Sequence, residues 1–149
     1  TLVLNGAGTS TQYLMSMYEA GLYLGSKTSD AAAIVEANEP MAIRLEIVSG
    51  MVSQEKLVDA LNEGFAAATA RDPAALRGEI EQFRKCFAAP IAKGDKFDLA
   101  YFPGRGVIVL KNGKRQGAIP GLAFKQALFS IWLGKAPADD DLKAAMLGK

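Results

Sequence analysis

Few residues of this chain have side chains suited to catalysis or metal binding, and histidine is absent. Without histidine there is no Ser-His-Asp or Cys-His nucleophile system, no His-based zinc or iron site and no His-ligated haem. The one cysteine, Cys86, excludes an intrachain disulfide and a cysteine-only metal cluster. No clear cationic pocket is available to stabilise its thiolate, so we expect a partly buried, unreactive side chain. We expect no cofactor and no metal.

Two short motifs resemble ligand sites, but each has a structural explanation. Gly6-Ala7-Gly8 follows a predicted strand, as a phosphate-binding turn does. The residues after it are predicted to form another strand, so the helix N-terminus that would hold a phosphate is missing. Asp139–Asp141 resembles a metal cluster, yet acidic residues after Pro137 are what the start of a helix favours. We therefore expect helix capping there and no dinucleotide site.

The basic residues offer two further candidates. Arg44 and Glu46 share a strand face, where they are either cross-strand partners or solvated charges. An arginine placed in a cleft would instead be the best remaining cationic anchor for a carboxylate. Lys111, Lys114 and Arg115 make a hairpin basic. Lysines that protect an exposed sheet edge are the favoured explanation, and an anion-binding patch is the alternative.

Composition indicates one globular domain over residues 1–149, with 50% hydrophobic and 22% charged residues. A formal net charge of +1 creates no strong field toward nucleic acid or anionic lipid, so we expect no nucleic-acid partner. No apolar run is long enough for an integral membrane segment. The first residue, Thr1, fits either a cleaved secretory signal or a shortened chain.

The pattern of the N-terminal third predicts strands with one helix between them. Residues 2–4 form a short strand that ends in a turn at 5–8. Residues 11–24 carry apolar side chains on both faces, which predicts a central strand covered on both sides, with a bulge near Gly21. Ser29 and Asp30 cap a helix that continues through Asn38. Residues 41–47 alternate and form the clearest strand.

The remaining residues predict helices and hairpins. Ser53 opens an amphipathic helix, and Asp72-Pro73 opens another. Asn112-Gly113 is the signal of a two-residue type I′ hairpin. The other expected elements are strands at 96–102, 106–110 and 114–119, a helix from Pro120 to Leu133 with Gly134 as its C′ residue, and a short helix after Pro137. This order favours an α+β fold in which helices cover a mostly antiparallel sheet.

The helix at 122–133 is apolar on two opposite sides. Phe124, Leu128 and Ile131 share one side with Trp132 beside them, and Leu133 lies nearly opposite. A core helix between the sheet and other helices is the commoner origin of this pattern. The alternative is that one side lines an apolar ligand cavity.

Several motifs together resemble those of the bacterial chalcone isomerase-like proteins, over nearly the whole chain. They are Leu4 to Gly8, Tyr18 to Leu24, Gly94-Asp95, Gly113-Lys114, Ile119-Pro120-Gly121, Ala127 to Gly134, Pro137 and Asp141-Leu142-Lys143. The resemblance implies the chalcone isomerase fold, an antiparallel sheet layered with helices over an apolar cleft. Bacterial members commonly carry a secretory signal, which implies a periplasmic or secreted protein.

The resemblance also indicates where the chain departs from the active family members. Plant chalcone isomerases and their fatty-acid-binding relatives use an arginine just after the glycine turn, and Ser10 stands there in this chain. A hydroxyl cannot replace a bidentate guanidinium. Tyr18 matches the tyrosine that shares the ligand carboxylate with that arginine. Ile131 stands where the plant enzymes have threonine, and the helix after Ser53 lacks their Tyr and Asn pair.

We therefore expect a non-catalytic protein that binds a small apolar or amphipathic, fatty-acid-like molecule between sheet and helices. The alternatives are an isomerase-type enzyme, an intramolecular lyase, acting on an unknown substrate, and a structural or interaction module whose cleft is filled by side chains. Any protein partner is unknown. The candidate ligand-binding residues are Ser10, Tyr18, Phe124, Leu128, Ile131 and Trp132.

Overall fold

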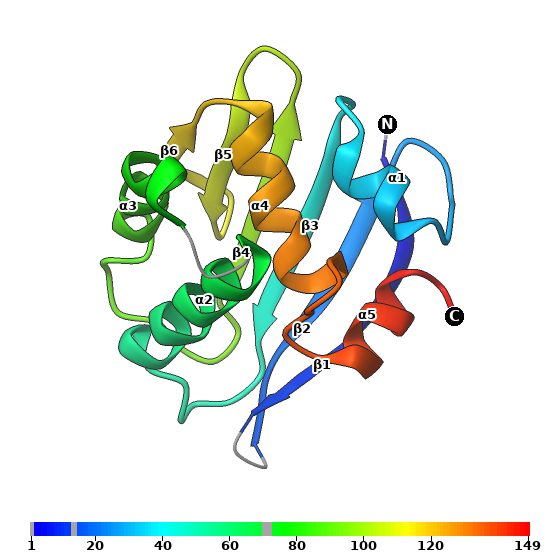
Figure 1. The fold of residues 1–149 in the computed structure, drawn as a ribbon. Helices are drawn as coiled ribbons and strands as arrows, with labels where there is room; N and C mark the ends of the chain where they lie inside the picture. The colour runs from blue at the N-terminus through cyan, green and yellow to red at the C-terminus, as the bar shows by residue number, and fades with distance from the viewer. Residues whose placement is uncertain (1, 13–14, 70–72) are drawn as a thin grey trace.

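The computed structural model describes residues 2–12, 15–69 and 73–149. Within them, six strands form one sheet in which each strand pairs antiparallel with the next along the chain (Figure 1). The strands are β1 (Val3–Gln12), β2 (Met15–Leu24), β3 (Met41–Ile47), β4 (Lys96–Phe102), β5 (Gly106–Lys111) and β6 (Lys114–Ile119). The expected α+β fold with an antiparallel sheet is confirmed.

The helices lie together on one face of this sheet (Figure 1). They are α1 (Ala31–Glu36), α2 (Gln54–Ala68), the 3₁₀ turn η1 (Pro73–Leu76), α3 (Arg77–Lys85), α4 (Leu122–Leu133) and α5 (Asp140–Met146). Helix α4 crosses the middle of the sheet, with α2 and α3 on one side of it and α1 and α5 on the other. None of the described helices has the length and hydropathy needed to span a bilayer.

Strand β3 shows how the sheet separates core from surface. Met41, Ile43, Leu45 and Ile47 are buried, whereas the residues between them are partly or fully exposed. Successive side chains of a strand point to opposite faces, so the buried set faces the helices. On the other face, Arg44 forms a bidentate pair with Asp98 of β4, with distances of 2.6 and 3.0 Å.

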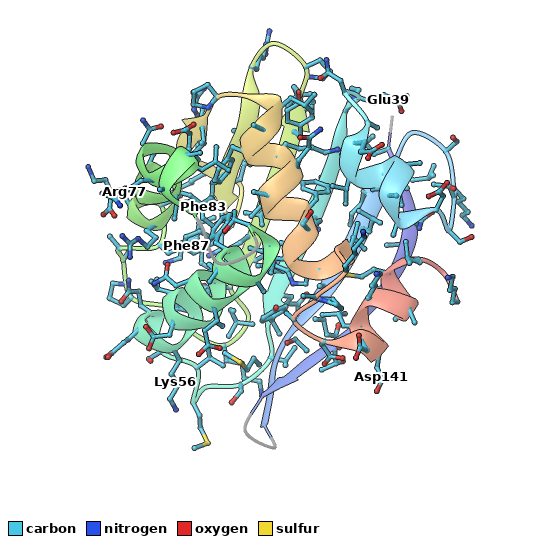
Figure 2. All side chains as sticks on the ribbon, viewed as in Figure 1. Glu39, Lys56, Arg77, Phe83, Phe87 and Asp141 are labelled. Atoms are coloured by element: carbon cyan, nitrogen blue, oxygen red, sulfur yellow. The ribbon has the colours of Figure 1, made fainter. Side chains whose placement is uncertain are left out.

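Five phenylalanine rings form the centre of the core between α4 and the helix pair α2 and α3. Their centroids lie 4.8 to 5.7 Å apart in edge-on and tilted pairs, which is the geometry that aromatic pairs prefer. The rings belong to Phe65, Phe83, Phe87, Phe97 and Phe124, and Figure 2 labels two of them. Side chains therefore fill this part of the layer between sheet and helices.

The glycine turn predicted at residues 5–8 is wrong, because these residues continue strand β1. The glycines are needed for packing against α5. A Cβ at Gly6 would lie 2.1 Å from the carbonyl oxygen of Ala145, and one at Gly8 would lie 2.8 Å from the Ala145 Cβ. Helix α5 thus approaches the strand backbone at a distance that only glycine permits.

Strand β2 also differs from its prediction. It lies next to the edge strand β1, and the described helices cover one of its faces, while Glu19 on the other face is exposed. The register is regular at Gly21, so the bulge predicted there is wrong. The irregularities fall in the pairing with β1, between Leu4 and Gly6 and between Ser10 and Thr11.

Most local signals of the sequence are confirmed. Asp30 and Ser53 cap α1 and α2 through bonds to backbone N–H groups three residues ahead. Asn112 and Gly113 have φ values of 51° and 85°, as a type I′ turn requires. Gly134 does end α4, but with a φ of −75° it is extended, not a left-handed C′ residue. The predicted cap Asp72 lies outside the described residues.

The sequence analysis missed Lys125 of α4, which is fully buried. Its ammonium donates to the carbonyl oxygens of Ile34, Val35 and Ala37 at 2.6 to 2.8 Å. These carbonyls belong to the last turn of α1, where no intrahelical donor remains. Lys125 therefore fastens α1 to α4.

Candidate functional site

A pocket of about 270 Å³ lies where β1 and β2 meet α2, α4 and the segment after α4. We call it the tyrosine pocket. Its walls are mostly apolar and include Leu57, Leu61 and Ile131, with the Ser10 and Tyr18 side chains contributing hydroxyl groups. The other lining residues are Ala60, Glu63, Gly64, Ala67, Ala136, Pro137 and Ala138.

Paired strands position the two hydroxyl side chains. Ser10 of β1 is the register partner of Tyr18 on β2, and both side chains are buried. The indole Nε1 of Trp132 donates to the Tyr18 hydroxyl at 2.9 Å. Burial raises the pKa of the Tyr18 phenol above its ordinary value, while bonds from Trp132 and Ser10 oppose this rise. Tyr18 is thus a neutral phenol at physiological pH.

The charges around the tyrosine pocket are negative. Glu63 lines it, and the Asp139 carboxylate is close enough to contribute to the raised pKa of Tyr18. None of the described residues that line this pocket is lysine or arginine. Arg44, the cationic anchor considered from the sequence, pairs with Asp98 on the face of the sheet opposite to the helices. It cannot reach this pocket.

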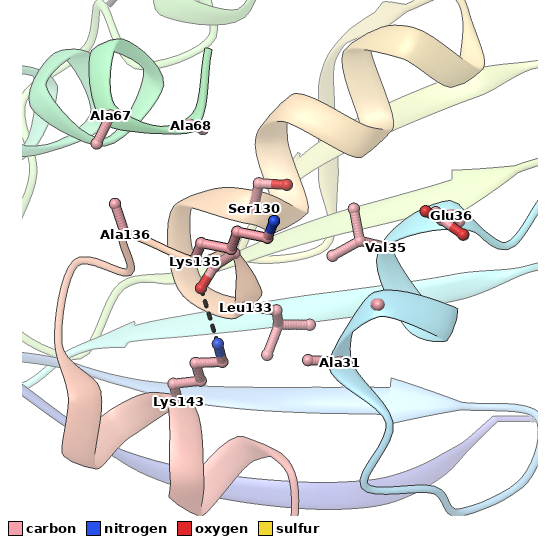
Figure 3. A pocket seen from close by; sticks show the side chains of 12 residues that line it. Ala31, Val35, Glu36, Ala67, Ala68, Ser130, Leu133, Lys135, Ala136 and Lys143 are labelled. Atoms are coloured by element: carbon pink, nitrogen blue, oxygen red, sulfur yellow. Dashed lines mark hydrogen bonds between the residues drawn. The ribbon is translucent and has the colours of Figure 1, made fainter. Parts of the chain in front are cut away.

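A larger pocket of about 520 Å³ adjoins the first, because Ala67 and Ala136 line both. We call it the lysine pocket. It lies between the C-terminal ends of α2 and α4, helix α1 and the start of α5 (Figure 3). Its lining residues are Ala31, Ala32, Val35, Glu36, Ala67, Ala68, Ser130, Leu133, Gly134, Lys135, Ala136 and Lys143. Small and aliphatic side chains thus adjoin two ammonium groups.

The structure brings together some of the residues predicted to bind ligand. Ser10, Tyr18 and Ile131 line the tyrosine pocket, and Trp132 contacts it through its bond to Tyr18. Phe124 and Leu128 lie in the core and line none of the described pockets, since Phe124 packs against Phe65 and Phe83. Phe124 therefore faces packed rings, whereas Ile131 on the same side of α4 lines the tyrosine pocket.

The sequence analysis missed the residues of α2 and of the segment after α4. Gly64 was the detectable signal, because a glycine in the interior of an amphipathic helix usually marks a close approach. A Cβ there would lie 2.6 Å from Cγ2 of Ile131. No sequence pattern marked Lys135 and Lys143 as pocket residues, since lysines near a helix end or on a short helix are common on any protein surface.

Two other candidates from the sequence have structural roles. Asp139 caps α5 by accepting from the Leu142 backbone N–H at 3.0 Å. Cys86 is buried against the carbonyl of Gln82, and burial raises the pKa of its thiol. Among the described residues, no group of three or more carboxylate or cysteine side chains could hold a metal ion.

Together these features define a helix-covered antiparallel meander with an apolar pocket between sheet and helices. A family model described as chalcone isomerase-like matches residues 1–148, so the chain belongs to that family. The chain is also similar to a fatty-acid binding protein of Arabidopsis thaliana, with a TM-score of 0.76 and 18% identity over 98% of this chain and 86% of that one. At this identity the likeness shows a shared fold. No curated protein matches the chain in sequence.

Proposed function

We propose that this protein binds a small amphipathic, fatty-acid-like molecule and does not catalyse a reaction on it. The observation that carries the proposal is the tyrosine pocket, with apolar walls and two hydroxyl groups. Ligand pockets combine wide apolar contact with a few polar groups in this way. A solved structure that shares the fold is a fatty-acid binding protein, which supports the same ligand class.

Trp132 provides the test, because its indole is bonded to a residue that lines the pocket. Palmitate titrated into the protein is expected to change Trp132 fluorescence saturably. Native mass spectrometry of freshly purified protein is expected to show bound lipid. Ala60→Phe would fill the tyrosine pocket and abolish both signals, whereas Ala89→Phe at an exposed position outside the described pockets would preserve them. Equal binding by both variants would contradict the proposal.

A structural module is the second candidate, and one observation favours it. The aromatic side of α4 is packed against other rings, so part of the cleft expected from the sequence is filled by side chains. Under this alternative neither palmitate nor a flavonoid-sized compound binds. The titration above distinguishes the two functions.

We also propose that the protein is a bacterial, exported member of the family. Its resemblance to the bacterial members in the motifs from Leu4 to Lys143 supports this assignment. Fractionation of cells that express the natural gene is expected to place the protein in the periplasm or the medium. Recovery from the cytoplasm alone would contradict it.

A further inference from the structure

The two adjoining pockets carry opposite charges, and this difference assigns an orientation to an amphipathic ligand. Glu63 lines the tyrosine pocket and Asp139 acts on its phenol, so a carboxylate there would meet two like charges. The Tyr18 hydroxyl accepts a bond from Trp132, so its own O–H is left as a single neutral donor, and none of the described lining residues adds a cation beside it. The tyrosine pocket therefore suits an uncharged alkyl chain better than an anionic headgroup.

The lysine pocket offers what the tyrosine pocket lacks. Among the described residues, the Lys143 ammonium donates one hydrogen bond, to the Gly134 carbonyl oxygen at 2.8 Å. Because an ammonium has three N–H donors, two remain for a ligand. Lys135 also lines the pocket, and its side chain extends toward Ser130 (Figure 3). Glu36 also lines this pocket; like Lys135 and Glu63 it is exposed, and it lies beyond Val35 in that view, so two lysines face one carboxylate here.

The walls of the lysine pocket also suit the methylene groups next to a headgroup. Val35, Leu133 and several alanines line it, and its volume of about 520 Å³ lies within the range of small-molecule sites. Ala67 and Ala136 line both pockets, so the lysine pocket lies beside the tyrosine pocket, and the side chains at this junction are small.

We propose that Lys135 and Lys143 bind the carboxylate of a fatty-acid-like ligand whose alkyl chain extends past Ala67 and Ala136 toward Tyr18. The inference rests on the proposed function and adds an orientation to it. The cationic anchor is supplied by α5 and by the segment after α4, while the position after the strand glycines holds Ser10. In this orientation the headgroup of the bound ligand lies between α1 and α5.

The affinity test compares palmitate with hexadecanol, which has the same chain without the charge. In the double variant Lys135→Met/Lys143→Met the Kd of palmitate is expected to rise about tenfold, the effect of losing charge-assisted bonds. The Kd of hexadecanol is expected to change less than about twofold, because uncharged ligands lose no ion pair. Lys93→Met/Lys114→Met is the matched control at two exposed positions. The double variant loses the bond from Lys143 to Gly134 and could fail to fold for that reason. In that case palmitate binding is measured on the single variant Lys135→Glu, which keeps this bond.

A second measurement locates the headgroup directly. Stearate with a nitroxide at carbon 5 is expected to broaden the amide NMR signals of Lys135 and Lys143, and stearate labelled at carbon 16 those around Ser10 and Tyr18. The reverse pattern, or lysine variants that bind palmitate normally, would overturn the orientation while leaving the proposed function intact. If wild-type protein bound neither palmitate nor hexadecanol, the proposed function itself would fail.

Discussion

The indole Nε1 of Trp132 donates a hydrogen bond of 2.9 Å to the hydroxyl of Tyr18, and both side chains are buried. This bond joins α4 to strand β2 at the wall of the tyrosine pocket. The bond holds the phenol in place. Because it also joins the indole to a residue that lines the pocket, we expect Trp132 fluorescence to change when a ligand occupies the pocket.

Tyr18→Phe is expected to lower the free energy of unfolding by about 1–3 kcal/mol, because it leaves the buried Trp132 N–H without its acceptor. Urea unfolding followed by circular dichroism measures the change. Tyr23→Phe is the control, since Tyr23 is half-buried on the face of the sheet opposite to the helices. Equal stability of both variants would show that another group or water replaces the lost acceptor.

Lys125→Met is expected to lower the free energy of unfolding by about 2–4 kcal/mol, because the terminal carbonyls of α1 lose their donor. Amide hydrogen exchange is expected to accelerate first in α1, which Lys125 fastens to α4. The control is Lys93→Met at an exposed position, for which a change within about 0.5 kcal/mol is expected. Unchanged exchange in α1 would contradict the capping role.

The same lysine gives a pH dependence of defined sign. Burial lowers the pKa of Lys125 from 10.5 to about 8. Between these values the unfolded chain binds more protons than the folded one, so stability rises with pH. The free energy of unfolding of the wild type, minus that of Lys125→Met, is expected to increase between pH 8 and 10.5 by at most about 1.4 kcal/mol per unit. A difference that falls with pH would mean that the ammonium is favoured in the folded state.

The sequence predicted elements whose signals are local. Capping residues Asp30 and Ser53, the Asn112-Gly113 turn and the alternation of β3 each depend on a few neighbouring residues, and all are present in the structure. One exception is the strand β1, where glycines that normally indicate a turn are required by contact with α5. The two partners of that contact are more than a hundred residues apart, so no local pattern reveals it.

The candidate site was also predictable only in part, because contacts between elements that are distant in the sequence decide which residues line a pocket. The family resemblance pointed to Tyr18, whose side chain is buried and lines the tyrosine pocket. The apolar side of α4 is the same pattern whether it contacts other rings or a cavity, so Phe124 could not be assigned to the core in advance. Lys125 lies within that apolar helix, and only the position of α1 explains its burial.

A hydroxychalcone is expected to cyclise at its spontaneous rate in the presence of the protein. The reaction needs a donor that stabilises the developing oxyanion, and loss of one such donor costs on the order of a hundredfold. Ser10 stands where the family resemblance implies a guanidinium, and none of the described residues that line the tyrosine pocket is cationic. Absorbance of the chalcone over time measures the rate. Turnover well above the background that disappears in Tyr18→Phe would show that catalysis remains.

In Gly64→Ala, a gain in helix propensity is opposed by a steric cost at the wall of the tyrosine pocket. Alanine favours a helix interior over glycine by about 1 kcal/mol, but its Cβ would lie 2.6 Å from Cγ2 of the buried Ile131. Overpacking costs about 1–3 kcal/mol, and Ile131 is β-branched with little freedom to move. We expect a net destabilisation of up to about 2 kcal/mol by urea unfolding.

Gly78→Ala in α3 is the matched control, since a Cβ there meets no atom within 4 Å. Only the propensity gain applies, so the variant is expected to be more stable by about 0.5–1 kcal/mol. Both substitutions add one methyl group, which meets Ile131 at Gly64 in the interior of α2 and meets no atom within 4 Å at Gly78 in the first turn of α3. If Gly64→Ala were stabilised as much as Gly78→Ala, α2 and α4 would have to separate, and the tyrosine pocket would widen. Palmitate affinity measured on both variants would then report that widening.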